Sequence, residues 1–399
     1  MSLFNVYCRV YQNLFKVAVN FFNWRTPELI EGEGSLSRLP ALIKEHGFKR
    51  VMLITDANMV KLGFAGILQS GMEELGLACA VYDGTQPNPD ITNIEAAVKI
   101  YKENDCQCIV ALGGGSPMDC AKATGARIAR PEKTIRQMKG LLKVGKDTPR
   151  FYAVPTTSGS GSEATIAAVV SNHETHEKYP INDLHLIPDY AVLDPVLPKG
   201  LPPHITSTTG MDALCHAVEA YIGHSNTKQT EEYAIEAAKL IFDNLIKAYK
   251  NGGDLGARRN MQVAAFKAGV AFTRAYVGNI HAIAHTLGGF YNTPHGLANA
   301  VVMPYVLTEY GESAHKRLAE LADAVGLTGG SDAEKAAAFI EAIKDMNAAM
   351  NIPDKIEGIK DEDIDAMIEN AFKEANPLYP VPKIFTREDF KKIYKAVQK

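Results

Sequence analysis

The sequence carries little excess charge of either sign and no block of basic residues. Lysine and arginine total 42 against 46 aspartate and glutamate residues, which gives a formal net charge of −4. A protein that binds the phosphate backbone of a nucleic acid ordinarily carries a basic patch or stripe, so nucleic acid is not favoured as a partner. Small-molecule chemistry is the better expectation.

Cysteine is scarce, and its spacing excludes the usual cysteine-based sites. The chain has six cysteines in 399 residues, and only Cys106 and Cys108 are close in sequence. A separation of two positions is neither the CxxC spacing of a zinc site nor the start of a disulfide framework. We therefore interpret the cysteines as reduced and predict a cytoplasmic protein.

The sequence also has no long uninterrupted apolar run, although residues 3–22 are rich in apolar and aromatic side chains. Polar residues interrupt this segment at Arg9, Gln12, Asn13, Lys16 and Asn20. No small-residue cleavage site follows, so neither a signal peptide nor a membrane span is predicted. Apolar residues recur near helical spacing at Val6, Val10, Leu14, Val17 and Phe21. We predict an amphipathic helix that packs on the body of the protein, on a neighbouring subunit or on a membrane surface.

Composition and length indicate a folded protein of more than one domain. Apolar residues make up 46% and charged residues 22%, far from the composition of disordered chains. A chain of 399 residues exceeds a single ordinary core. Residues 194–203 contain four prolines, a density that is incompatible with a continued helix or a central strand. We therefore predict an N-terminal extension over residues 1–24, one domain over residues 25–200 and another over residues 201–399.

The two predicted domains differ in their hydrophobic pattern. Residues 50–155 alternate short β-branched runs with longer amphipathic stretches, which predicts βαβ units and a doubly wound parallel sheet. The expected strands are residues 51–55, 79–82, 108–112 and 152–154, and the expected helices are residues 64–75, 93–104 and 117–129. Residues 230–250 and 333–350 are alanine-rich with helical periodicity. The second half of the chain is therefore predicted to be almost wholly α-helical.

A glycine turn follows the expected strand 108–112, in the sequence Gly113-Gly114-Gly115-Ser116-Pro117-Met118-Asp119. Ligands of open α/β sheets bind at the carboxyl ends of strands, and glycine lets backbone N–H groups approach phosphate oxygens. We predict Ser116 as the N-cap, Pro117 as the first helical residue and Asp119 as the capping-box partner. The turn is a candidate pyrophosphate site, but it is not the GxGxxG fingerprint, and a turn capped only for stability is the alternative.

Two further polar positions follow strands of the same predicted sheet. Asp56 follows strand 51–55, where a carboxylate can accept hydrogen bonds from ribose hydroxyls and repel a 2′-phosphate, which favours NAD over NADP. The alternative is that Asp56 only caps the next helix. Residues 155–163 form a second loop, rich in hydroxyls and glycine, that could contact a ligand or simply be solvated.

Two clusters in the second half carry side chains that bind metals. Asp212 and His216 are four residues apart in a helical segment, so both side chains leave one face, and Glu219 on the next turn could join them or lie outside the site. His281 and His285 have the same spacing, and His295 follows a turn. Spacing alone does not select among these three histidines. A single histidine on an apolar helix is ordinarily a core residue, but two helix-anchored clusters favour a site for a divalent metal.

With these motifs the chain resembles the iron-dependent (group III) alcohol dehydrogenase family over nearly its whole length. The matching motifs are Gly113-Gly114-Gly115-Ser116 with Asp119, residues 155–163, Gly210-Met211-Asp212-Ala213-Leu214 with His216, and residues 281–296. The resemblance implies an α/β N-terminal domain with a parallel dinucleotide-binding sheet, followed by an all-α C-terminal metal-binding domain. It also favours a homodimer.

The resemblance further implies roles for single residues. The implied metal ligands are Asp212, His216, His281 and His295, with His285 in the active site but not on the ion. The implied cofactor contacts are Asp56, Asn88, Gly114, Gly115, Ser116, Asp119, Thr156, Thr157, Thr165 and Lys178. Two departures stand out, because Ser158 and Ser160 replace the usual alanine and threonine, and the extension to Trp24 goes beyond the family core.

The sequence therefore predicts a metal-dependent, NAD(P)-linked alcohol dehydrogenase or aldehyde reductase that moves a hydride between nicotinamide and a small primary alcohol or aldehyde. NAD is favoured over NADP, and Fe²⁺ over Zn²⁺. His285 is the candidate for relaying the proton, because imidazole exchanges protons near neutral pH. The alternatives are a metal-dependent lyase or hydrolase of the related dehydroquinate-synthase-like fold, and a non-catalytic nucleotide-binding protein.

Overall fold

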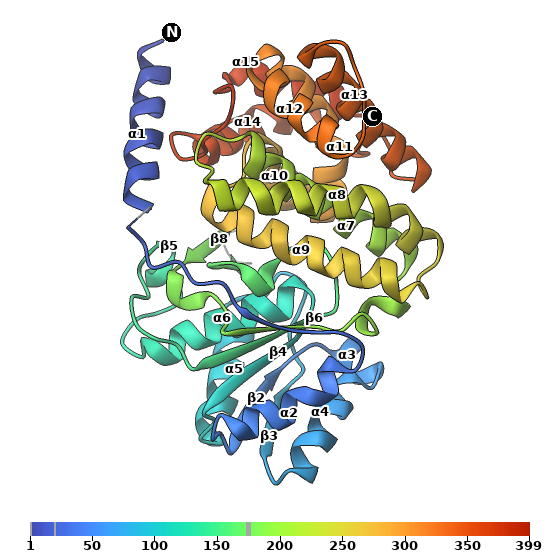
Figure 1. Cartoon of the computed structure of the whole chain (residues 1–399). Coiled ribbons are helices and arrows are strands. Elements are labelled where there is room, and N and C mark those ends of the chain that lie inside the picture. The colour runs from blue at the N-terminus through green and yellow to red at the C-terminus, as the bar shows by residue number, and fades with distance from the viewer. Residues whose placement is uncertain (1, 20, 173–176) are drawn as a thin grey trace. The chain divides into compact units, whose positions relative to one another are not determined.

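The computed structural model describes residues 2–19, 21–172 and 177–399, and Figure 1 shows its elements along the chain. The chain forms two compact units. One is Asn23–Gly200, and the other combines Leu201–Lys399 with Met1–Phe22. The first unit is an α/β structure and the second is built from helices.

A parallel sheet forms the centre of the α/β unit. Among the described residues this sheet has six strands in the order β1-β9-β6-β4-β2-β3, and neighbouring strands are parallel throughout. The strands are β1 (Glu28–Glu31), β2 (Arg50–Ile54), β3 (Ala78–Tyr82), β4 (Cys108–Gly113), β6 (Arg150–Pro155) and β9 (Tyr190–Leu193). The four predicted strands are confirmed, whereas β1 and β9 were not predicted. Because β2, β4 and β6 are neighbours, the residues that follow them share one edge of the sheet.

Helices cover both faces of this sheet. Val51 and Leu53 of β2 pack in a core with the helices on one face, whereas Met52 and Ile54 pack in a second core on the other. This alternation follows from the two-residue period of a strand that is buried on both sides. The helices of the first core are α2 (Ser35–Glu45), α3 (Ala57–Lys61) and α4 (Phe64–Glu74). Those of the second core are α5 (Ile91–Glu103) and α6 (Gly115–Ala129).

Helix α6 begins earlier than predicted. Its first residue is Gly115, and its N-cap is Gly114, which supplies no side-chain cap. The predictions of Ser116 as the N-cap, of Pro117 as the first helical residue and of a capping box with Asp119 are therefore wrong. Ser116 lies in the first turn, where its Oγ accepts the N–H of Asn88 at 3.3 Å, and Asp119 accepts a hydrogen bond from Ser162 at 3.3 Å. Because the cap is a glycine, no side chain covers the N–H groups of the first turn.

A smaller sheet and several short helices complete the α/β unit. Among the described residues this sheet has three strands, in the order β5-β8-β7, and β7 and β8 are antiparallel. Its strands are β5 (Gly140–Leu141), β7 (Ala167–Asn172) and β8 (Glu177–Asn182). The short 3-10 helices are η1 (Arg136–Met138), η2 (Ser162–Ala164), η3 (Leu184–Leu186) and η4 (Leu197–Gly200).

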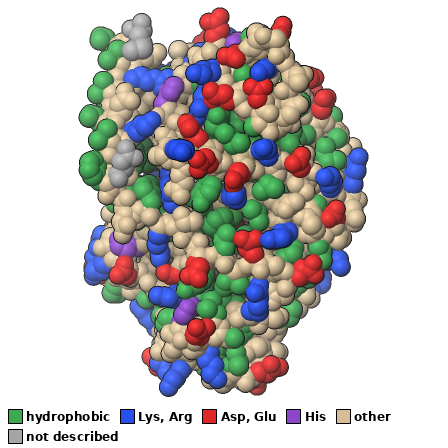
Figure 2. All heavy atoms as spheres, viewed as in Figure 1, with side chains coloured by type: hydrophobic (Ala, Val, Ile, Leu, Met, Phe, Trp, Pro, Cys, Tyr) green, Lys and Arg blue, Asp and Glu red, His purple; other side chains and the backbone are tan. Residues whose placement is uncertain are grey.

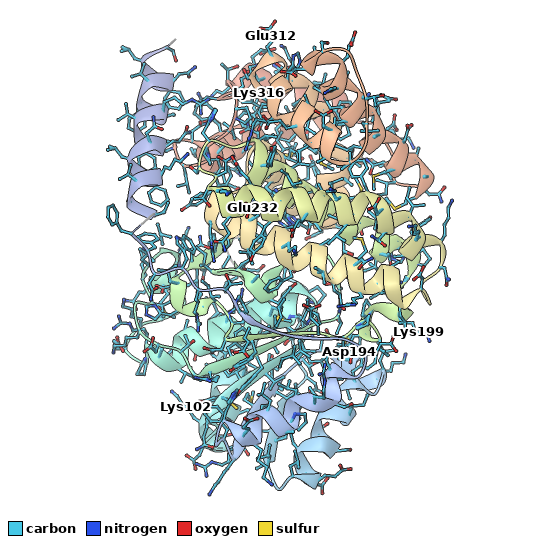
Figure 3. The ribbon with its side chains drawn as sticks, viewed as in Figure 1. Lys102, Asp194, Lys199, Glu232, Glu312 and Lys316 are labelled. Atoms are coloured by element: carbon cyan, nitrogen blue, oxygen red, sulfur yellow. The ribbon has the colours of Figure 1, made fainter. Side chains whose placement is uncertain are left out.

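Asp194, labelled in Figure 3, ties the end of β9 to the start of α2. Its Oδ2 accepts the N–H of Leu36 at 3.1 Å, and its Oδ1 accepts the N–H of Val196 at 3.1 Å. Helix α2 has Gly34 as N-cap and no side-chain cap of its own. A buried carboxylate from a distant strand therefore satisfies an N–H group that a local cap ordinarily binds.

The second unit consists of helices, which confirms the all-α prediction. Its helices are α7 (Pro203–Ile222), α8 (Lys228–Lys250), α9 (Leu255–Ala275), α10 (Asn279–Tyr291), α11 (His295–Tyr310), α12 (Glu312–Ala324), α13 (Asp332–Ala349), α14 (Asp361–Ala375) and α15 (Arg387–Val397). Helix α1 (Leu3–Val19) packs against this unit, so the predicted amphipathic helix is present. None of the helices in the described part of the chain combines the length and apolar character needed to cross a bilayer.

Helices α7 and α11 approach each other closely at Gly296. A Cβ at this position would lie 2.4 Å from the carbonyl oxygen of Thr208 on α7. A backbone atom cannot move aside as a flexible side chain can, so only glycine allows this approach. The contact fixes the first turn of α11, which begins at His295.

We therefore expect Gly296→Ala to destabilise the protein by about 1–3 kcal/mol, because the added methyl group overpacks a rigid contact. Gly289→Ala is the matched control, since nothing lies within 4 Å of a Cβ at that helical position. The control should be neutral or stabilise the protein by up to about 1 kcal/mol. Urea unfolding midpoints compare the variants, and equal midpoints for both would contradict the close approach.

Candidate metal centre and nucleotide site

Three helices bring the predicted metal ligands together. Asp212 and His216 lie one turn apart on α7, His281 lies on α10, and His295 is the first residue of α11. One donor atom from each of the four lies within 4.8 Å of the others. The Nε2 atoms of His295 and His281 lie 3.4 and 3.9 Å from Asp212 Oδ1. The rings of His216 and His281 are stacked, with centroids 4.6 Å apart.

These distances fit a single divalent ion. Metal–ligand bonds of about 2.1 Å in tetrahedral geometry separate the donor atoms by roughly 3.4 Å. The donor set of one carboxylate and three imidazoles is borderline in softness, which suits Fe²⁺ or Zn²⁺ better than Mg²⁺ or Ca²⁺. The residues of this structure therefore fit the metal that the sequence predicts.

Asn299, which the sequence reasoning missed, lies where the donor atoms converge. Its Nδ2 lies 2.7 Å from Asp212 Oδ1 and 3.2 Å from the Nε2 atoms of both His281 and His295. Three acceptor atoms, one each from Asp212, His281 and His295, thus surround the Nδ2 group of Asn299. A cation is stabilised by acceptor atoms that converge in this way. Asn299 Oδ1 is buried and has no hydrogen-bond partner among the described residues. Asn299 is four residues beyond His295 on the same helix, but asparagine at that spacing is no signal for a metal site.

Glu219 fixes the orientation of His281 by contacting Nδ1, the ring nitrogen that faces away from Asp212. His281 Nδ1 lies 2.6 Å from Glu219 Oε2, and Glu219 Oε1 accepts the N–H of Ile280 at 2.8 Å. Burial raises the pKa of Glu219 to about 7, while burial and the neighbouring imidazoles hold the pKa of His281 well below its usual range. His281 is therefore a neutral imidazole whose Nδ1 faces Glu219 and whose Nε2 faces Asp212. A histidine held in this way is the common form of a metal ligand.

His285 has a different environment from His281, although both lie on α10. Its Nδ1 lies 2.6 Å from Glu374 Oε1, and the hydroxyl of Tyr379 donates to the same oxygen at 2.9 Å. The side chain of His285 is 44% exposed, whereas that of His281 is 3% exposed. His285 stacks on His295 but does not belong to the set of four close donors. Glu374 is 89 residues from His285, so no sequence signal could have paired them.

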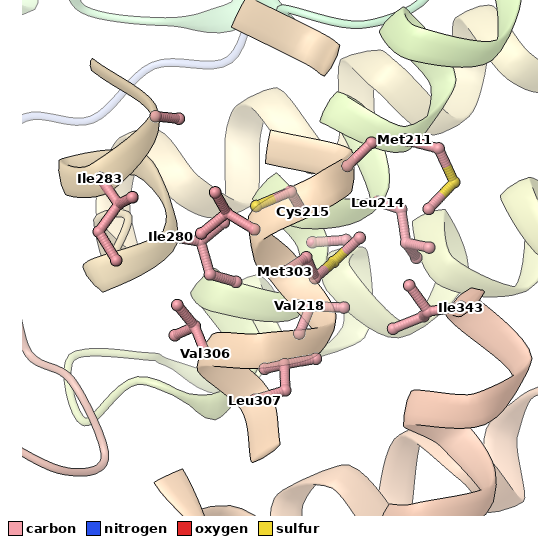
Figure 4. Packing of buried hydrophobic residues seen from close by; sticks show 14 of the residues in the cluster. Met211, Leu214, Cys215, Val218, Ile280, Ile283, Met303, Val306, Leu307 and Ile343 are labelled. Carbon is pink, nitrogen blue, oxygen red and sulfur yellow. The ribbon is translucent and has the colours of Figure 1, made fainter. Parts of the chain in front are cut away.

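The helices that carry these side chains share a dense apolar core. Figure 4 shows Met211, Leu214 and Val218 of α7 packed with Ile280 of α10 and Met303 of α11. Close packing of this kind transmits little motion, so the polar side chains on the opposite faces keep their mutual distances. The core thereby preorganises the metal centre.

In the α/β unit, the glycine turn meets Asp56 and the second polar loop. Gly113 has a φ of +150°, and a Cβ there would lie 2.5 Å from Pro117 and 3.4 Å from Asp56 Oδ2. The N–H of Thr156 donates to the Gly113 carbonyl at 3.0 Å, and Thr157 lies 3.4 Å from where a Gly114 Cβ would be. The structure thus places these predicted cofactor residues at one edge of the sheet.

Asp56 also caps a helix, as its alternative interpretation predicts. Its Oδ1 accepts the N–H groups of Asn58 and Met59 at 2.8 and 3.2 Å. Its Oδ2 is the oxygen that faces Gly113. Oδ1 of Asp56 thus caps helix α3, while Oδ2 lies beside the glycine turn. Helix capping and ligand binding by Asp56 therefore do not exclude each other.

Asn88 and Lys178 are linked to the turn through backbone contacts. Asn88 has a φ of +58° and donates its N–H to Ser116. Lys178 lies on β8 opposite Ser171, whose N–H donates to the carbonyl of Pro89 at 2.9 Å. These contacts bring both predicted residues to the loop that follows β3.

Lys122, a buried lysine that the sequence reasoning missed, holds the second polar loop to α6. Its Nζ donates to the carbonyl and hydroxyl oxygens of Thr165 at 2.8 and 2.9 Å, to Ser162 Oγ at 3.2 Å and to the Ala167 carbonyl at 3.0 Å. Burial lowers the pKa of Lys122 and raises that of Asp119. Thr165 and Asp119, both predicted cofactor contacts, thus belong to the network that shapes this loop.

Known proteins match nearly the whole chain. Residues 26–195 match the family described as iron-containing alcohol dehydrogenase, and residues 206–398 match the C-terminal part of the Fe-containing alcohol dehydrogenase family. Alcohol dehydrogenase 4 of Saccharomyces cerevisiae is 39% identical over 91% of this chain and 95% of its own length. NAD-dependent methanol dehydrogenase of Bacillus methanolicus is 35% identical over 94% of this chain and 99% of its own.

A solved structure agrees with these sequence matches. Alcohol dehydrogenase from Oenococcus oeni superimposes with a TM-score of 0.90 at 35% identity, covering 94% of this chain and 100% of that one. The family matches fall in both halves of the chain, which confirms the resemblance seen in the sequence. The chain belongs to the iron-containing alcohol dehydrogenase family.

Proposed function

We propose that this protein is an NAD-linked alcohol dehydrogenase that interconverts a small primary alcohol and its aldehyde. The observation that carries the proposal is the convergence of Asp212, His216, His281 and His295 in a chain of the iron-containing alcohol dehydrogenase family. Relatives that cover almost the whole chain are named for the oxidation of alcohols. The four residues are proposed as the ligands of a divalent ion, with Fe²⁺ favoured by the family and Zn²⁺ as the alternative.

The bound ion supplies Lewis-acid polarisation of the substrate oxygen, and the nicotinamide supplies the hydride acceptor. Asp212 brings the one negative charge of the ligand set. Its carboxylate would offset part of the charge of a divalent ion, and the imidazoles of His216, His281 and His295 would complete the ligand set. Glu219 lies 2.6 Å from His281 Nδ1, so it would leave Nε2 of His281 available to hold the ion.

His285 is proposed to relay the proton of the reaction. Glu374 holds its Nδ1, so Nε2 is the atom that would accept the proton of the alcohol or return it to the carbonyl. The side chain is 44% exposed, which gives the proton a route to solvent. A positioned imidazole of this kind contributes about 10²–10⁴-fold to rate in general acid–base catalysis.

The dinucleotide is proposed to bind at the edge of the sheet where β2, β4 and β6 end. The uncapped N–H groups at Gly115 and Ser116 suit the pyrophosphate, because a helix N-terminus attracts anions. Asp56 is proposed to accept hydrogen bonds from a ribose, and its charge favours NAD. The remaining proposed contacts are Asn88, Gly114, Asp119, Thr156, Thr157, Thr165 and Lys178.

Location and assembly are proposed from the cysteines and from the family. The six cysteines are free thiols, and all but Cys79 are buried. Burial raises the pKa of Cys79, Cys108 and Cys120 to about 12, which keeps these thiols protonated and unreactive. Reduced cysteines favour a cytoplasmic protein, and the family favours a homodimer.

Substitution of the proposed ligands tests the function directly. We expect Asp212→Ala and His281→Ala to lose both the metal and alcohol-dependent NAD reduction, because each removes a ligand. His285→Ala should retain the metal while kcat falls by about 10²–10⁴-fold. Elemental analysis of anaerobically purified protein and the change in nicotinamide absorbance measure the two effects, with His315→Ala on α12 as control. Full activity in metal-free Asp212→Ala, or no net nicotinamide change with any alcohol or aldehyde, would overturn the proposal.

Removal of the Glu219 charge tests how His281 is held. We expect Glu219→Gln to weaken metal binding by about 10–100-fold, the usual effect of losing a hydrogen-bond partner of a metal ligand. Competition with a chelator measures the affinity. Glu236→Gln, on the surface of α8, is the matched control and should bind metal as the unaltered protein does. Equal affinities in the two variants would show that Glu219 does not support the ligand.

The proposed cofactor preference depends on the charge of Asp56. We expect Asp56→Ser to raise the ratio of kcat/KM for NADP to that for NAD by about tenfold or more, because repulsion of the 2′-phosphate is lost. Serine is a good N-cap, so helix α3 should be retained. Asp90→Ser, which replaces the N-cap of α5, is the control. If the ratio of kcat/KM for NADP to that for NAD does not change in Asp56→Ser, Asp56 does not determine the cofactor preference.

A further inference from the structure

Helix α1 and the residues just beyond it expose a continuous apolar face. Six of its side chains are exposed by half or more, namely Leu3 90%, Tyr7 55%, Val10 52%, Leu14 67%, Val17 57% and Phe21 84%. Figure 2 shows hydrophobic side chains gathered along the edge of the molecule where Figure 1 places α1. Soluble proteins seldom leave an apolar patch of this kind uncovered.

The opposite face of α1 is fixed to the helical unit. Arg9 donates to the carbonyl oxygens of Val381 and Pro382 at 2.7 and 2.8 Å, and Gln12 donates to that of Tyr379 at 2.8 Å. Lys16 donates to the His224 carbonyl at 2.7 Å. These bonds set the rotation of the helix, so the apolar face points away from the body because of its anchoring.

The exposed side chains follow the spacing of a helix–helix seam. Positions 3, 7, 10, 14, 17 and 21 are separated alternately by four and three residues. This is the spacing of the apolar positions in a coiled coil, where such residues interlock with those of a second helix.

We propose that this face of α1 binds the same face of a second copy of the chain. The six side chains present on the order of 800 Å² per copy, so pairing would remove roughly 1,000 Å² or more from water, the size of a specific interface. The face contains no charged residue, so two copies meet without repulsion, as a two-fold symmetric contact requires. The family match begins at residue 26, so this interface lies outside the family core and is independent of the proposed function.

A membrane surface suits this face less well. Helices that lie in the headgroup region are rich in lysine and arginine, which attract anionic lipids. The only basic residues of α1 are Arg9 and Lys16, and both bind backbone carbonyls of the helical unit. No cation in α1 therefore adjoins the apolar face.

Two adjacent lysine substitutions test the interface in the full-length protein. Leu14→Lys places a charge in the centre of the face, whereas Asn13→Lys places the same charge on the exposed flank of the same helix. We expect Leu14→Lys to halve the mass of the particle in sedimentation equilibrium, and Asn13→Lys to leave it unchanged. Both side chains are exposed in the native structure, so thermal unfolding, metal content and turnover should match those of the unaltered protein.

Equal masses for the unaltered protein and Leu14→Lys over a micromolar dilution series would overturn the proposal. Flotation with vesicles of phosphatidylcholine and phosphatidylglycerol gives the second readout. If the unaltered protein keeps the mass of Leu14→Lys and floats with these vesicles while Leu14→Lys does not, the occupant is a lipid surface and not a second copy. If neither protein floats and the masses are equal, the face has no self-association and the proposal also fails.

Discussion

The proposed metal centre depends on holding His281 Nε2 against the carboxylate of Asp212, and Glu219 provides that constraint. Glu219 lies on α7 with Asp212, and it binds both the imidazole and the backbone of α10. The approach is so close that a Cβ at Gly278 would lie 2.8 Å from Glu219 Oε1. Gly278 before α10 leaves room for the side chain of Glu219, whereas Gly296 at the start of α11 leaves room for the backbone of α7.

The nucleotide site is built on a different principle from the metal centre. Its polar groups come from loops and helix ends, and they meet because parallel strands end at one edge of a sheet. The turn requires glycine at position 113. Its φ of +150° is unfavourable for other residues, and a Cβ there would collide with Pro117. Lys122 then fixes the end of the second loop, because four oxygens of Ser162, Thr165 and Ala167 share the three N–H donors of its ammonium group. Backbone shape thus sets the proposed phosphate site, whereas side-chain geometry sets the proposed metal site.

The sequence predicts those parts of the fold and of the candidate site that depend on local periodicity. It does not predict the parts that depend on contacts between residues far apart in the chain. The strands, the helical half and the pairing of Asp212 with His216 follow from spacings of two and of about four residues. His281 and His285 have identical local spacing, and only Glu219 and Glu374, both far away in sequence, give them different environments. The cap of α6 was predicted wrongly because serine is a strong N-cap in general, whereas here two glycines before it start the helix and leave its N–H groups uncovered.

Helix α1 shows why a single amphipathic pattern can have two partners. Its sequence was compatible with packing on the body, on a neighbouring subunit or on a membrane. The body contacts use the polar side chains of Arg9, Gln12 and Lys16 and the rings of Phe4 and Phe15, which pack on Phe372 and Tyr276, and not the six positions of the exposed face. Burial of apolar surface stabilises a protein by roughly 25 cal/mol per Å², so the six exposed side chains leave a further hydrophobic contribution for another surface. Docking on the body therefore does not compete with self-association but orients the face for it.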